Sequence, residues 1–208
     1  MPAASDPHQE MLRALGLIDA GAESSLVNAE CVRVARTLRE AGCRVIGLVP
    51  ATRDDAVPPV AIRLGIALVQ LSGATVAYID ANVHWPALSA IAERPSASPG
   101  EGDGTGAGEV YATRWLSGTL ALLTPPRVET AGEVVPQLRR VLDNGAELFQ
   151  FVLVDLTGFD VIGEHAAAAA LMDGVIIVGR AGKTKETVLL AHRDELRTAR
   201  LLGVLLVG

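Results

Sequence analysis

The chain has 208 residues, half of them hydrophobic, and carries a formal net charge of −6. This length suits one α/β domain, while the negative charge and the 3% aromatic content argue against a nucleic-acid-binding surface. The sequence shows no signal-peptide pattern and no apolar stretch that would span a bilayer, and Cys31 and Cys43 lack metal-ligand spacing and suit a reducing cytosol. We therefore expect a cytoplasmic protein, with any membrane association made through a partner.

In chain order, residues 1–22 are predicted to be a flexible leader and residues 23–208 a single domain. A segment rich in Gly, Pro and Ser, at about 94–110, is too poor in apolar residues to pack and is predicted to be a flexible loop. Elsewhere strands alternate with helices, which indicates a three-layer, doubly wound, mostly parallel α/β sheet. Strands are expected at 45–49, 74–80, 119–123, 149–155, 174–179 and 201–207, and helices at 24–40, 58–71, 87–91, 132–145, 166–172 and 185–200.

The first helix carries two stripes. One is apolar and predicts packing against the sheet, whereas the other holds Glu30, Arg33 and Arg36 at intervals of three residues. Such a charged stripe is usually a solvated face. The pattern Glu-x-x-Arg-x-x-Arg gains a second interpretation, a subunit contact, from the resemblance described below.

The first strand leads through residues 50–57 into a helix that Pro58 and Pro59 open, because the first turn of a helix tolerates proline. In nucleotide-binding α/β proteins, phosphate binds at this kind of loop, on backbone amides at the helix N-terminus. Here no glycine lies between Gly47 and Gly65, and the prolines remove two amides. The architecture of a P-loop protein is therefore predicted without its phosphate chemistry.

The charges of this loop also oppose phosphate binding. Asp54 and Asp55 place negative charge where a phosphate would lie, and the only lysines of the chain are Lys183 and Lys185, far along the sequence. The stretch Ala-Gly-Lys-Thr at 181–184 resembles the end of a Walker A motif. It follows the wrong strand and lacks the upstream glycine, so we do not interpret it as a phosphate loop.

Several segments, in a fixed order from about Ser24 to the C-terminus, resemble the cytoplasmic ATPase domain of bacterial tyrosine kinases (the CpsD/CapB type), which is a group of MinD/ParA-like P-loop ATPases. The resemblance implies a P-loop NTPase-like fold with a degenerate Walker A loop. The segments that carry it are Glu30–Arg36, Val60–Leu68, Ile79–Pro86, Val152–Gly158 and Asp173–Thr184.

The resemblance also assigns positions to a nucleotide site. Asp155 stands at the Walker B position, and Asp80 and Asn82 at the second acidic motif, whereas His84 and Trp85 receive no role. Since the lysine, glycines and hydroxyl of Walker A are missing, we expect no catalytic residue, no cofactor and no metal. Asp80 and Asp155 would hold Mg²⁺ only if ATP bound; otherwise we expect them to accept amide hydrogen bonds from neighbouring loops. The degenerate Walker A positions are Ala56, Val57, Pro58 and Pro59.

The preferred hypothesis is a non-catalytic relative that regulates or scaffolds polysaccharide synthesis and export. In the family, the helix matching Glu30, Arg33 and Arg36 makes subunit contacts, so the implied partners are a second copy, an active paralogue or a membrane polysaccharide co-polymerase. Autophosphorylation is not expected, because no tyrosine cluster follows the last strand and the only tyrosines are Tyr78 and Tyr111. Two alternatives stay open: an ATP-binding kinase or ATPase with a divergent loop, and a MinD/ParA-like positioning scaffold.

Overall fold

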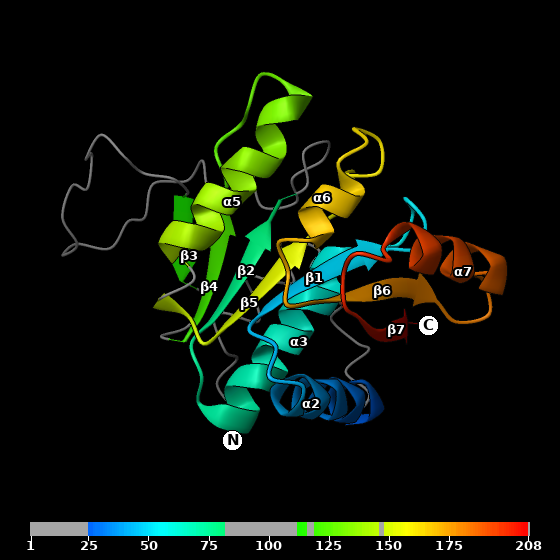
Figure 1. Ribbon diagram of the computed structural model, residues 1–208. Helices are drawn as coiled ribbons and strands as arrows, with labels where there is room; N and C mark the ends of the chain where they lie inside the picture. Colours follow the sequence, from blue (N-terminus) through cyan, green and yellow to red (C-terminus); the bar gives the residue numbers. More distant parts are fainter. Residues whose placement is uncertain (1–24, 82–111, 116–118, 146–147, 208) are drawn as a thin grey trace, which may run out of the picture.

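The computed structural model describes residues 25–81, 112–115, 119–145 and 148–207. In these residues, seven strands form one sheet in the order β3-β4-β2-β5-β1-β6-β7 (Figure 1). Neighbouring strands run parallel except β3, which pairs antiparallel with β4 at one edge. The strands are β1 (Val45–Pro50), β2 (Val76–Asp80), β3 (Ala112–Trp115), β4 (Leu120–Thr124), β5 (Phe151–Asp155), β6 (Gly174–Arg180) and β7 (Leu201–Val207).

Helices cover both faces of the sheet, so the domain has three layers (Figure 1). The helices over residues 25–40 and 57–72 pack their apolar residues on one face. The helices over residues 134–145 and 165–169, together with Leu196, contribute to the core on the other face. The helices are α2 (Ser25–Glu40), α3 (Val57–Ser72), the short 3-10 helix η1 (Ala131–Glu133), α5 (Val134–Gly145), α6 (His165–Ala169) and α7 (Glu186–Glu195).

The predicted three-layer, mostly parallel architecture is confirmed. The sequence did not predict β3, whose four residues gain their extended conformation by pairing with β4 rather than from a strong local pattern. The helices predicted at 166–172 and 185–200 are shorter, since each gives way to turns before the next strand. The predicted leader 1–22, helix 87–91 and loop 94–110 lie outside the described residues.

Strand β1 lies at the centre of the sheet, between β5 and β6. The loop that follows it, residues 51–56, begins with a hydrogen bond from the Ala51 amide to the Val178 carbonyl on β6, at 2.6 Å. Helix α3 then returns along the sheet, and Gly65 lets it pack closely, because a Cβ there would lie 3.2 Å from Leu120 Cδ1. Gly73 ends α3 in a left-handed conformation (φ 66°), as expected of a glycine at this position.

No helix in the described part of the chain has both the length and the apolar composition that a membrane crossing requires.

Candidate functional site

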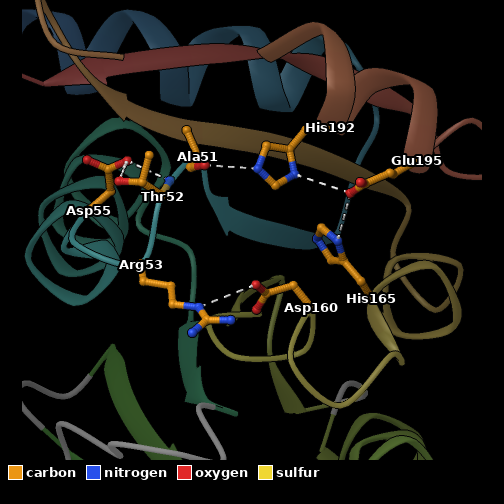
Figure 2. Close-up of polar contacts among 8 residues, drawn as sticks. All are labelled: Ala51, Thr52, Arg53, Asp55, Asp160, His165, His192 and Glu195. Carbon is orange, nitrogen blue, oxygen red and sulfur yellow. Dashed lines mark hydrogen bonds and ion pairs between the residues drawn. The ribbon is translucent and has the colours of Figure 1, made fainter. Parts of the chain in front are cut away.

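The loop 51–56 folds around one of its own carboxylates. Asp55 is only 4% exposed, and its Oδ2 accepts hydrogen bonds from the Thr52 amide at 2.8 Å and the Thr52 hydroxyl at 2.9 Å (Figure 2). The Asp55 amide in turn donates to the Thr52 carbonyl at 3.0 Å. Donors that could face an external anion are therefore directed at an internal one.

Arg180, the last residue of β6, supplies the matching positive charge. Its Nε lies 3.1 Å from Oδ1 of Asp55, and its guanidinium also donates to the Asp54 carbonyl. Asp55 is thus neutralised by an ion pair inside the fold, whereas Asp54 is exposed. From the sequence, Asp54 and Asp55 were expected to act alike. Within the described residues of this loop, only Asp54 adds unpaired negative charge at the surface.

The start of α3 offers few donors to a phosphate. Ala56 precedes the helix in an extended conformation and makes no side-chain capping bond, and Pro58 and Pro59 occupy the first turn, as predicted. The prolines have no amide hydrogen to donate. Val57, at one of the four positions aligned with Gly-Lys-Ser-Thr of the family, is completely buried.

The predicted Walker B residue, Asp155, lies opposite Asp80 where β5 and β2 pair. Asp155 is buried; its Oδ1 accepts from the amide of Thr157 at 2.8 Å and from the hydroxyl at 2.5 Å, and its Oδ2 accepts from the Tyr78 hydroxyl at 3.1 Å. The expectation that Asp155 accepts a loop amide is confirmed. Asp80 is buried as well, at 2% exposure.

Burial dominates the electrostatics at these strand ends. It raises the pKa of Asp155, an effect that the hydrogen bonds from Thr157 and Tyr78 oppose. Burial, with the neighbouring carboxylates, also raises the pKa of Tyr78 well above its ordinary value. Tyr78 therefore stays protonated and acts as a hydrogen-bond donor. Asn82, His84, Trp85 and Tyr111 lie outside the described residues.

The charged stripe of α2 lies on the surface, as predicted. Glu30, Arg33 and Arg36 are all exposed, and Arg33 Nε forms an ion pair with Glu30 Oε2 at 2.7 Å. Arg36 lines a surface pocket with Arg39 and Glu40. The exposed stripe is available for contact with another molecule, and its role in assembly remains a prediction.

The sequence comparison gives one distant curated relative. No protein-family model matches the sequence. The chain is 25% identical over 178 residues to the succinoglycan biosynthesis transport protein ExoP of Rhizobium meliloti (strain 1021). This alignment covers 78% of the chain and 22% of ExoP, so the chain spans about a fifth of that relative's length.

Solved structures give a clearer match. The kinase domain of VpsO is 19% identical, with a TM-score of 0.65 over 95% of this chain and 97% of that one. The chimerical protein CapA2B2 is 16% identical, with a TM-score of 0.68 over 96% and 97%. The tyrosine kinase domain of BceF is 21% identical, with a TM-score of 0.63 over 88% and 76%. The chain has the fold of bacterial tyrosine-kinase domains. The resemblance inferred from the ordered segments is thereby confirmed at the level of the fold.

Within this tyrosine-kinase-like fold, the Ala-Gly-Lys-Thr stretch at 181–184 forms the turn between β6 and α7. The Thr184 hydroxyl accepts a hydrogen bond from the Arg180 amide at 2.7 Å, and the Thr184 amide donates to the Arg180 carbonyl at 2.9 Å. Gly182 has φ 70°. The threonine hydroxyl is thus used to close a turn, which agrees with our decision not to interpret this stretch as a phosphate loop.

The structure also gathers residues that the sequence did not single out. Arg53, in the loop 51–56, forms an exposed ion pair with Asp160 at 3.7 Å, which joins the loops after β1 and β5. His165, His192 and Glu195 meet beside them (Figure 2). The one-turn spacing of His192 and Glu195 was visible in the sequence. The approach of His165, 27 residues earlier, depends on how α6 and α7 pack and had no local signal.

Proposed function

We propose that this chain is a non-catalytic relative of the bacterial tyrosine-kinase domains that assembles with itself or with an active paralogue. In this role it regulates or scaffolds polysaccharide synthesis and export at the inner face of the membrane. The observation that carries the proposal is the internal pairing of Asp55 with Thr52 and Arg180 in the loop where the fold would hold phosphate.

The two carboxylates of this loop oppose nucleotide binding in different ways. A triphosphate entering the loop would meet the exposed charge of Asp54 directly, and it would have to displace the buried Asp55 carboxylate from its donors. Displacement would leave a buried charge without its partner, which is strongly unfavourable. The prolines at the start of α3 provide no replacement donors. Binding energy for ATP is therefore missing at the position where this fold normally supplies it.

The surface of α2 supports a role in assembly. Three charged side chains, the acidic Glu30 and the basic Arg33 and Arg36, remain exposed while the opposite side of the helix packs on α3 and the sheet. Their mutual ion pair is exposed and therefore weak, so it can be exchanged for pairs with another molecule at small cost. In a ring of like subunits, such a stripe would contact a different surface of the next copy.

The polysaccharide link comes from the relatives. ExoP is a succinoglycan biosynthesis transport protein, and this chain aligns with about a fifth of it. A chain with the fold of the kinase domains but a self-paired phosphate loop would act in such a system through contacts rather than phosphoryl transfer. Recruitment to the membrane would then come from a polysaccharide co-polymerase partner.

Assembly can be tested by measuring mass in solution. The wild type is compared with Arg33→Ala/Arg36→Ala, alone and mixed with an active tyrosine-kinase domain encoded by the same genome. Arg139→Ala/Arg140→Ala is the matched control, because it removes the same charge from exposed positions of α5 on the other face of the sheet. The proposal predicts that only the α2 variant loses higher-mass species. Monomers in every sample, unchanged by the active domain, would contradict it.

A further inference from the structure

His165, His192 and Glu195 form a cluster that the proposed function does not use. His165 is the first residue of α6, and His192 and Glu195 lie one turn apart on α7. One candidate ligand atom from each residue lies within 4.8 Å of the other two. The imidazole rings meet edge to face, with centroids 5.6 Å apart, and both point toward the Glu195 carboxylate (Figure 2).

A contact with the loop 51–56 fixes the tautomer of His192. Its Nε2 lies 3.0 Å from the carbonyl oxygen of Ala51. A carbonyl oxygen can only accept, so Nε2 carries the hydrogen and Nδ1 of the neutral ring keeps a free lone pair. A histidine that binds a metal through one ring nitrogen usually donates the N–H of its other ring nitrogen to a carboxylate, a backbone carbonyl or water, which fixes the orientation of the ring.

The lone pair of His192 has no hydrogen-bond partner. Nδ1 is buried. In the part of the chain that the structure describes, no other buried side-chain nitrogen or oxygen lacks a hydrogen-bond partner. Oε2 of Glu195 is 3.8 Å from it, too far for a hydrogen bond. Two ligand atoms that hold a tetrahedral ion at about 2 Å each are roughly 3.3 Å apart, so small side-chain movements would bring this pair to that distance when an ion binds.

His165 completes the set from α6. Its Nδ1 lies 3.9 Å from the same Oε2 of Glu195, and its side chain is 10% exposed. Burial, followed by the neighbouring His192, lowers the pKa of His165, while Glu195 and Asp160 act in the opposite direction. His165 thus supplies a second imidazole nitrogen beside the same carboxylate oxygen.

We propose that His165, His192 and Glu195 bind a divalent transition-metal ion, with Zn²⁺ as the expected ion. Two imidazoles and one carboxylate suit Zn²⁺, with a fourth position left for water, and they do not suit Mg²⁺ or Ca²⁺, which prefer oxygen ligands. The Glu195 side chain is 62% exposed, so an ion reaches the site from solvent.

The ion would fasten a weakly anchored part of the domain. None of the ten residues of α7 is buried, so the helix gains little from apolar packing. A bound ion would link α7 to α6 and, through His192, to the first residue of the loop 51–56. The site would thus stabilise the same loop whose internal pairing opposes nucleotide binding, although the two inferences rest on different residues.

The test uses the full chain without an affinity tag, treated with a chelator and titrated with Zn²⁺ in a calorimeter. We expect one equivalent to bind and the thermal unfolding midpoint to rise. His165→Ala and Glu195→Gln should each weaken binding by more than the roughly 10–100-fold that changes around a ligand cause. Glu186→Gln, an exposed carboxylate at the start of α7, is the matched control and should bind as the wild type does.

The absorption spectrum of bound Co²⁺ provides a separate check, because it reports which ligand atoms hold the ion. Binding at this site predicts visible absorption of a low-symmetry nitrogen and oxygen complex, without the near-ultraviolet band of cysteine ligation. Glu195→Gln changes an exposed side chain and should keep the fold, which circular dichroism verifies. Absence of one-to-one binding would overturn the proposal. So would binding that the ligand variants leave unchanged, or a cysteine-type spectrum from Cys31 or Cys43.

Discussion

The loop 51–56 and the outer stripe of α2 are both charged, but their charges are satisfied in opposite ways. In the loop, Asp55 is buried and paired with Arg180 from a strand 125 positions away in the chain. On α2, Arg33 pairs with Glu30 at the surface, with side chains 69% and 61% exposed. Charges paired inside the fold maintain its structure, whereas charges paired at the surface remain available to a partner. The comparison therefore sets a loop whose carboxylate is paired inside the fold against a helix face whose charges are exposed.

The largest expected effect comes from removing the internal pair. Asp55→Ala leaves the Arg180 charge and the Thr52 donors without their acceptor, and we expect it to lower the free energy of unfolding by about 2–3 kcal/mol. Urea denaturation measures this change. Arg53→Ala, which breaks the exposed pair with Asp160 in the same loop, is the control and should cost less than about 1 kcal/mol. Equal effects of the two variants would mean that the Asp55 pair has no special role in the loop.

A smaller effect is expected at the Walker B position. Asp155→Asn keeps an oxygen to accept the Thr157 bonds and removes a buried negative charge, so stability at pH 7 should be unchanged or higher by about 1 kcal/mol. Since the pKa of Asp155 is raised by folding, its contribution to stability is largest at low pH and is lost as the pH rises through the folded-state value.

Unfolding measured from pH 7 downward checks this prediction. The wild type should gain stability relative to Asp155→Asn as the pH falls. A loss of several kcal/mol in Asp155→Asn at pH 7 would instead show that the ionised carboxylate is required by the fold.

The smallest effect on stability is expected on α2. Arg33→Ala/Arg36→Ala should change the free energy of unfolding by less than about 0.5 kcal/mol, because the affected pair is exposed. The same variant should lose assembly in solution. Chemical denaturation of wild type and variant, at a concentration where both are monomeric, separates these two effects. A large loss of stability would assign the stripe to the fold rather than to a partner.

Local patterns in the sequence were enough to predict the described strands other than β3, most helix positions and the exposed stripe of α2. They also predicted that the prolines open α3 and that Asp155 accepts a loop amide. They did not predict the partner of Asp55, because Arg180 reaches the loop only when β6 pairs beside β1. The histidine cluster was missed for the same reason: His165 and His192 belong to separate helices, and their contact follows from tertiary packing.

The most direct test of the account is a calorimetric titration of the purified chain with ATP and with ADP in the presence of Mg²⁺. If the Asp55 carboxylate, held by Thr52 and by Arg180 from β6, occupies the donors of the loop 51–56, no binding should be detected up to millimolar nucleotide. Micromolar, Mg²⁺-dependent binding that is lost in Asp80→Ala or Asp155→Ala would contradict the account and identify the chain as a nucleotide-binding kinase or ATPase with a divergent loop.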